Sequence, residues 1–374
     1  MQNLEDVRVI ERTWGELGGA AEPLASLRMT GESGGLPSVF RVGTLASACA
    51  ALATLGVADV LAARALAAPR SVCIDRRHAA IAFRSERYVT ALGWEIPPPW
   101  DPIAGDYETA DGFIRLHTNY ENHRAAVLAV LGTPAERDSI AARVRDFCAA
   151  ELESAVVNAG GAAAALRSAQ DFALHPQGQA LEREPLFATK KRALERELRV
   201  DHGERPLSGL RVLDLTRVIA GPVCTRFLAA YGADVLRVDP PGFQEVGALL
   251  VETTAGKRRT FLDLRRDADR ARFEALVEQA HVIVHGYRSD ALERLGLGDL
   301  WRHAANPALI SVSFDAYGFS GPWAARRGFD SLVQMSSGIA ARGREVLGAR
   351  RPVSLPAQAL DHGTGYLMAA AVCR

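Results

Sequence analysis

One carboxylate near the end of the sequence has neighbours that suit covalent chemistry. Asp361 stands within PVSLPAQALDHGTGYLMAAAV, just ahead of a glycine-rich turn and an apolar helix. A carboxylate in that place is most often the N-cap of the helix. A catalytic carboxylate there would have its charge tuned by the helix N-terminus and would pack closely against Gly363 and Gly365. The residues themselves leave both roles open.

Two further segments contain groups that could hold an anion. TRVIAGP (216–222) follows a short apolar run and opens a helix, so it is either a bare turn or an anion site at the carboxyl end of a strand. AGKRRTFLDLR (255–265) places the cations of residues 257–259 before a strand and Arg265 after it. That run predicts either a solvated basic surface or a phosphate site.

Composition and missing motifs argue against several other classes of protein. Lys and Arg total 44, as do Asp and Glu, so the balanced charge gives no general case for a nucleic acid or a membrane surface as partner. The sequence has no H-E-x-x-H or GxxxxGK[ST] motif and no G-x-G-x-x-G after a strand, which disfavours the corresponding metalloproteases and nucleotide-binding proteins. The five cysteines are scattered without a C-x-x-C pair, which favours a reduced, cytoplasmic protein without a metal site.

Two segments near the start bear on targeting. The first residues, MQNLEDVRVIERTWGEL, are acidic and polar where a secretory signal would be basic and then apolar. The longest apolar stretch (43–63) is rich in alanine and contains Asp59, so we expect a buried helix and not a membrane span.

The elements that position Asp361 alternate between strand and helix patterns. RVLDL, ADVLRVD, TFLDL, HVIVHGY and ALISVSF read as strands, with helices between them at VCTRFLAAYG, 268–279 and 289–295. This alternation predicts an α/β fold, a parallel sheet with helices on both faces. A charged segment (190–209) broken by proline and glycine marks the join to the first half.

The first half reads as a smaller α+β unit. We expect helices over 45–68, over HAAIAFRSERYVTALG, over 122–131, over 134–158 and over 161–174. SVCID reads as a strand, and DGFIRLH as an edge strand. The predicted division is an extension (1–36), the first-half unit (37–200) and a sheet domain (207–374).

The order of motifs in the second half resembles the class III CoA-transferases of the CaiB/BaiF type, a family that includes formyl-CoA:oxalate and L-carnitine CoA-transferases and the 2-methylacyl-CoA racemases. The resemblance begins at LSGLRVLDLTRVIAGPVCTRFLAAYGADVLRVDPPG and continues through AGKRRTFLDLR, VIVHGYRSDALERLGLG, NPALISVSFDAYGFSGP and RGFDSLVQMSSG to ALDHGTGYLMAAAV. It implies a Rossmann-like large domain and a smaller α+β domain. It also implies a homodimer, interlocked as in relatives.

The resemblance implies a reaction and a set of residues. An aspartate of the family attacks the acyl-CoA thioester to give an anhydride and then an aspartyl-CoA thioester, and Asp361 stands at that position, with Gly363 supplying backbone freedom for oxyanion contacts. CoA and acyl-CoA would be substrates, with a carboxylic acid as acceptor and no permanently bound cofactor. The positions that match CoA contacts are Arg217, Val218, Ile219, Ala220, Leu262, Asp263, Leu264, Arg265, Gly286, Tyr287, Arg288, Arg294, Arg327, Gly328, Phe329 and Asp330. The basic run at 257–259 becomes a candidate phosphate neighbour.

The sequence departs from the family in two places. The family's G-D-x-x-R segment is replaced by FQEVGALLVE (243–252). Segments that relatives carry after the aspartate resemble 43–56, 71–88, 111–132 and 175–185 of this chain, so their order is inverted. Either the chain is permuted or fused so that 37–200 completes the module begun at Leu207, or a tandem protein is truncated in its second copy. In the first half, RVGTLAS (41–47) stands in the aspartate's slot without a carboxylate, which predicts a structural role.

Three functions stay open at this point. Racemases carry a histidine where this chain has Phe329, so a general base is missing there and a transferase is favoured over a racemase. A non-catalytic CoA-binding member of the family is the third reading, because the G-D-x-x-R segment is absent. The acyl donor and the acceptor acid are not encoded in any motif.

Overall fold

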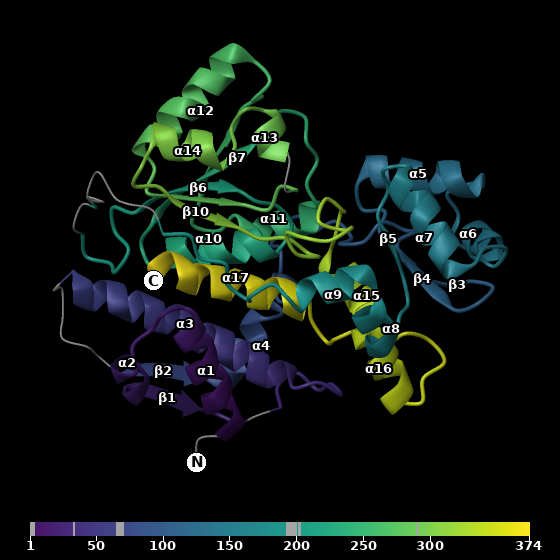
Figure 1. Ribbon diagram of the computed structural model, residues 1–374, viewed down its shortest axis with the longest axis horizontal. Helices are drawn as coiled ribbons and strands as arrows, with labels where there is room; N and C mark the ends of the chain where they lie inside the picture. The colour runs from purple at the N-terminus through teal and green to yellow at the C-terminus, as the bar shows by residue number, and fades with distance from the viewer. Residues whose placement is uncertain (1–3, 33, 65–70, 192–199, 201–202, 289–290) are drawn as a thin grey trace.

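The second half of the chain folds around one parallel sheet (Figure 1). The computed structural model describes residues 4–32, 34–64, 71–191, 200, 203–288 and 291–374. The sheet has the strand order β10-β9-β6-β7-β8. Its strands are β6 (Arg211–Leu215), β7 (Asp234–Asp239), β8 (Arg258–Phe261), β9 (Val282–His285) and β10 (Ile310–Ser313). Every pairing is parallel, as the alternation of strands and helices predicts.

Helices cover both faces of this sheet because its central strands are apolar on both sides. Val212 and Val282 pack into a core with α10 (Ala220–Ala230) and α17 (Ala359–Cys373). Leu213 and Ile283, one residue further along each strand, pack into a second core with α12 (Asp267–Gln279). In Figure 1, α12 and α14 (Asp299–Ala305) lie above the sheet, and α10 and α17 lie below it. The predicted α/β class is confirmed, whereas the Rossmann-like label and the domain limits stay predictions.

A long apolar helix of the first half packs against the helix that carries Asp361. Helix α3 (Val42–Ala63) shares its core with α17 and α10, which explains its near-continuous alanine and leucine content. The two backbones approach closely, since a Cβ on Gly56 would stand 2.9 Å from the Cβ of Cys373. By length and hydropathy α3 could cross a membrane, and here it serves as a core helix. It is also covered by α1 (Leu4–Glu16) and α4 (Arg76–Ala82).

The rest of the first half forms two small sheets. Strands β1 (Leu27–Thr30) and β2 (Val72–Asp75) pair in parallel. Strands β3 (Gly105–Glu108), β4 (Phe113–Leu116) and β5 (Ala163–Ala165) form an antiparallel sheet that is backed by α5 (Glu121–Leu131), α6 (Arg137–Val144) and α7 (Ala149–Asn158). The remaining helices are α2 (Glu22–Ala25), α8 (Ala169–Leu174), α9 (Pro176–Leu181), α11 (Gly247–Thr253), α13 (Ala291–Arg294), α15 (Asp330–Ser336), α16 (Ile339–Val346) and a 3₁₀ turn (Ser85–Arg87).

Several expected elements need correction. DGFIRLH contains the central strand β4 and not an edge strand. The helix expected over 134–158 is two helices, and the one expected over 161–174 begins with strand β5, because alanines with high helix propensity are buried between β4 and α15. The helix expected over HAAIAFRSERYVTALG ends at Ala82. Parts of the predicted helices over 45–68 and 289–295 and of the charged join lie outside the described residues.

Candidate active site

The loop between β6 and α10 holds an unusual backbone conformation. Val218 has a φ of 63°, which makes it the one described residue other than glycine with a positive φ. A β-branched side chain is strained in this region. The Val218 N–H donates to Glu245 Oε2 at 3.2 Å, and Arg237 holds the same oxygen at 3.1 Å. A buried ionic cluster therefore fixes the loop in this conformation.

Asp361 lies in the first turn of α17, so the N-cap role is wrong. The N-cap position is Gln358, and Asp361 is the third residue of the helix. Its backbone N–H donates to Asp330 Oδ2 at 3.1 Å, and the N–H of Leu360 donates to the same oxygen at 2.9 Å. Within the described part of the chain, no hydrogen bond to the Asp361 carboxylate is found. The carboxylate is therefore free to react, while its backbone is held.

Burial and negative neighbours change the acidity of this carboxylate. Removal from water, followed by the charges of Asp330 and Glu86, raises the pKa of Asp361 well above the ordinary carboxyl range. Burial also raises the pKa of Asp330 to about 6, against hydrogen bonds from Gln334 and from the two backbone N–H groups. A carboxylate of raised pKa is a better nucleophile once ionised.

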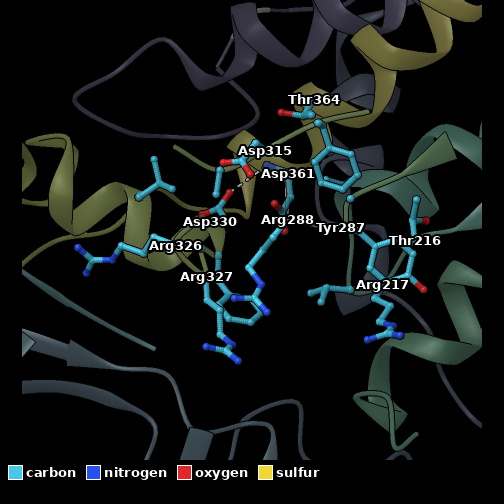
Figure 2. Close-up of a pocket in the computed structure, with 18 of the residues that line it drawn as sticks. Thr216, Arg217, Tyr287, Arg288, Asp315, Arg326, Arg327, Asp330, Asp361 and Thr364 are labelled. Carbon is cyan, nitrogen blue, oxygen red and sulfur yellow. Dashed lines mark hydrogen bonds between the residues drawn. The ribbon is translucent and has the colours of Figure 1, made fainter. Parts of the chain in front are cut away.

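Asp361 borders a pocket of about 470 Å³ at the carboxyl ends of the sheet strands, here called the basic pocket (Figure 2). Ligands of open α/β folds bind at this end of the sheet. Predicted residues that line it are Arg217, Val218, Ala220, Gly286, Tyr287, Arg288, Arg327, Gly328, Phe329, Asp330 and Asp361. The predicted site residues of the β6 turn, the β9 end and the 327–330 loop are thus brought together.

The cations of the basic pocket differ in how they are held. Arg326 is neutralised by Glu153 at 2.8 Å, and the guanidinium of Arg217 lies 3.7 Å from the ring centroid of Phe243. Burial and the neighbouring charge of Arg288 lower the pKa of Arg327. No carboxylate partner for Arg288 or Arg327 is found among the residues that the structure describes. Two adjacent guanidiniums in this state form a site for a phosphate or carboxylate.

Other predicted residues lie outside this pocket. Ile219 lines a second pocket, and Leu262, Asp263, Leu264, Arg265 and Arg294 line neither. Leu262 is buried in the core beneath α12, and Arg265 is exposed and paired with Asp263 at 2.8 Å. Contact of these five positions with CoA stays a prediction.

The expected phosphate contact of the 257–259 run needs correction at Lys257. Lys257 is fully buried, and its Nζ lies 2.9 Å from Asp214 Oδ2. Arg258 pairs with Asp234, and Arg259 with Asp239. The Lys257 side chain therefore cannot reach a phosphate, whereas the side chains of Arg258 and Arg259 are at least partly exposed and their contact with a phosphate stays a prediction.

The expected role of Gly363 also changes. Gly363 is a buried helical residue, and a Cβ placed on it would meet Cys49 and Leu45 of α3 at 3.7 to 3.9 Å. It packs against the first half of the chain and does not supply backbone freedom at the pocket.

A second pocket of about 600 Å³ meets the basic pocket at Asp361, here called the apolar pocket. The two share Tyr120, Val218, Phe329, Asp330 and Asp361. One wall of the apolar pocket comes from residues 96–100 of the first half, and another from Ile219 and residues 246–249 of the second. The two halves of the chain therefore build this pocket together.

Sequence reasoning missed several residues at this junction. Tyr120 and His123 line the basic pocket, and Tyr120 Oη donates to Glu245 Oε1 at 2.7 Å. The ring of His117 stacks on Phe329 with centroids 3.6 Å apart. Burial lowers the pKa of His117 to about 3 and that of His123 to about 4, so both are neutral at neutral pH. The cluster HTNYENH (117–123) was the sequence feature that could have pointed to these residues. Its importance could not be recognised locally, because it depends on a contact with a residue far along the chain.

Comparison with known proteins gives a consistent result for the second half. Residues 207–374 match the model of CoA-transferase family III. An acyl-CoA transferase from Gibberella moniliformis is 32% identical over 255 residues, which are 62% of this chain and 44% of that protein. A succinyl-CoA–D-citramalate CoA-transferase from Chloroflexus aurantiacus is 34% identical over 149 residues, 37% of each protein.

Among solved structures, the hypothetical protein Rv3272 from Mycobacterium tuberculosis is similar at 29% identity, with a TM-score of 0.39 over 45% of this chain and 49% of that chain. The present chain spans less than half the length of each of these three proteins. The sequence similarity over residues 207–374 includes Asp361 and the predicted residues of the basic pocket. The similarity to CoA-transferase family III therefore lies in residues 207–374 of this chain.

Proposed function

We propose that this protein transfers CoA between an acyl-CoA and a carboxylic acid, with Asp361 as the covalent carrier. The observation that carries the proposal is the position of Asp361, an unpaired carboxylate of raised pKa where a basic pocket meets an apolar one. The match of residues 207–374 to CoA-transferase family III supports CoA transfer in general. The homodimer and the cytoplasmic location expected from the sequence stay predictions.

The reaction proceeds in four balanced acyl transfers. The Asp361 carboxylate attacks the thioester carbonyl, and the C–S bond breaks. CoA departs as the thiolate, and an acyl-aspartyl anhydride is formed. The thiolate then attacks the aspartyl carbonyl, which releases the donor acid and forms an aspartyl-CoA thioester. The acceptor carboxylate attacks that thioester to give a second anhydride, and the thiolate attacks its acyl carbonyl, which yields the new acyl-CoA and free Asp361.

The described residues assist these steps by position and charge. Arg288 and Arg327 would hold a phosphate of CoA in the basic pocket. Asp330 fixes the first turn of α17 through the N–H groups of residues 360 and 361, so the nucleophile does not move when it becomes acylated. The raised pKa makes the ionised Asp361 a strong nucleophile toward the thioester.

Trapping with hydroxylamine tests the proposal. The protein is incubated with acetyl-, succinyl- or phenylacetyl-CoA and then with hydroxylamine, and we expect a hydroxamate at Asp361 in peptide mass spectra. Asp361→Asn should lose the adduct and lower CoA transfer by roughly a thousandfold or more. Asp315→Asn is the matched control, because Asp315 lines the same pocket with a pKa raised by burial to about 6. Full transfer activity in Asp361→Asn would refute the mechanism.

A racemase is the second candidate, and the position of His123 favours it. His123 lines the basic pocket beside Phe329, so an imidazole stands near the position where racemases carry one on another segment. Such an enzyme would exchange the α-hydrogen of a 2-methylacyl-CoA with solvent. Incubation in D₂O followed by NMR distinguishes the two: α-deuteration without an Asp361 adduct would replace the transferase proposal with the racemase.

A further inference from the structure

The walls of the apolar pocket differ from those of the basic pocket. Ile96 and Pro97–Pro99 stand on one side, and Ile219, Val246 and Leu249 on the other. The pocket volume of about 600 Å³ lies within the range of sites for drug-sized molecules. A wall of this composition favours an apolar body over a charged one.

The charges around the apolar pocket also select against a second carboxylate. Its lining contains the carboxyl groups of Glu86, Asp330 and Asp361. The cation in the lining is Arg87, whose side chain is 48% exposed and lies 3.7 Å from Glu86. A dicarboxylate bound here would bury its far charge among apolar groups and acids, which is unfavourable.

Two of the neutral polar side chains in the lining have an atom with no described partner. Ser331 Oγ and His117 Nδ1 are buried without a hydrogen-bond partner among the described residues. Burial lowers the pKa of His117 to about 3, so the ring carries no charge at neutral pH. Such groups can bind an oxygen of one carboxyl group, and they cannot neutralise a second carboxylate.

We propose that the apolar pocket holds the acyl group and that the substrates are monocarboxylic acids with a bulky apolar body, aromatic or branched. This inference rests on the transferase function proposed above. The substrate carboxyl carbon would lie at Asp361, with the body between residues 96–99 and the side chains of Ile219 and Leu249. Short dicarboxylates such as succinate are poor substrates on this account.

Ligand binding and turnover test the substrate class in parallel. Binding of phenylacetate and of succinate is measured by calorimetry or saturation-transfer NMR, and kcat/KM is measured for phenylacetyl-CoA and succinyl-CoA. In the unaltered protein the apolar ligand should be preferred by about tenfold or more in both measurements. Ile96→Lys, which places a cation on the apolar wall, should reduce that preference by about tenfold. Ile81→Lys is the matched control, because Ile81 is 50% exposed and lines neither pocket.

The outcomes separate this inference from the transferase proposal. Equal or tighter binding of succinate, or an unchanged preference in Ile96→Lys, would overturn the substrate class even if succinyl-CoA gives an Asp361 hydroxamate. Preferential binding of phenylacetate that Ile96→Lys abolishes would support it. That support holds even if no acyl-CoA labels Asp361, in which case the transferase proposal alone fails.

Discussion

The interior of the parallel sheet and the basic pocket treat charge in opposite ways. Inside the sheet, each charged group has an opposite partner: Lys257 with Asp214 at 2.9 Å, and Arg237 with Asp239 at 2.9 Å. Burial alone would raise the pKa of Asp214, and the Lys257 ammonium with the hydroxyls of Thr216 and Thr225 lowers it instead. These charges are paired within the fold.

At the pocket, like charges stand side by side. Asp361 and Asp330 are neighbours, and so are Arg288 and Arg327. Like-charge neighbours are unfavourable in the free protein, and the cost is recovered when a ligand or a proton supplies the missing charge. A cluster of cations in the sequence therefore does not by itself identify an anion-binding site. What matters for ligand binding is whether those cations already have anionic partners within the fold.

The largest expected effect is a loss of stability when the buried Lys257–Asp214 pair inside the sheet is broken. Lys257→Met leaves Asp214 charged and buried without its cation, which should lower the free energy of unfolding by about 3–5 kcal/mol. Denaturant titration measures this. The double variant Asp214→Asn/Lys257→Met should recover much of the loss, and a double variant as unstable as the single one would show that the pair is not the cause. Arg258→Met is the control, because its partner Asp234 is exposed and the change should stay within about 1 kcal/mol.

The next largest effect is expected on the affinity for CoA, from the two cations of the basic pocket that have no carboxylate partner among the described residues. Arg288→Met removes one guanidinium from a phosphate contact, so the Kd of CoA should rise about tenfold or more, and less at high salt. The free energy of unfolding should not fall, since repulsion with Arg327 is relieved. Calorimetry on Arg272→Met supplies the control, because Arg272 is exposed, pairs with Asp269 and lines neither pocket; the expected change in Kd is within about twofold. Equal losses in both variants would show that the affinity for CoA does not depend on contact with the cations of the basic pocket.

The smallest expected effect is a shift in pH dependence. Asp361 must lose its proton to attack, so kcat/KM should rise with pH above the ordinary carboxyl range. Asp330→Asn removes one negative charge beside Asp361, which lowers the pKa of Asp361 and moves this rise to lower pH by about one unit. Profiles of kcat/KM against pH for both proteins measure the shift. An unmoved profile would mean that a different group controls the rate.

The sequence predicts the sheet and much of the basic pocket because their patterns are local. Strand-to-helix alternation reports which residues face a core, and each of the segments 216–220, 286–288 and 327–330 sits at one strand end or loop. The partner of Lys257 could not be foreseen, because Asp214 stands on another strand and the pairing depends on the register of β6, β7 and β8.

The apolar pocket could not be predicted from the sequence for a related reason. Pro97–Pro99 have no strand or helix pattern in the sequence, and the side chains opposite them come from residues more than a hundred positions later. Segment 243–252, which departs from the family pattern, supplies Phe243 to the basic pocket and Glu245 to the Val218 loop. The segment that departs from the family pattern therefore still contributes to the basic pocket.

The left-handed Val218 has a consequence for local opening of the protein. Its conformation costs on the order of 1–3 kcal/mol and is held by Glu245, which Tyr120 of the first half also holds. Release of residues 105–165 from the second half would remove one support of Glu245 and let Val218 relax. Hydrogen exchange at the Val218 amide therefore detects the release of residues 105–165 from the second half before either half unfolds.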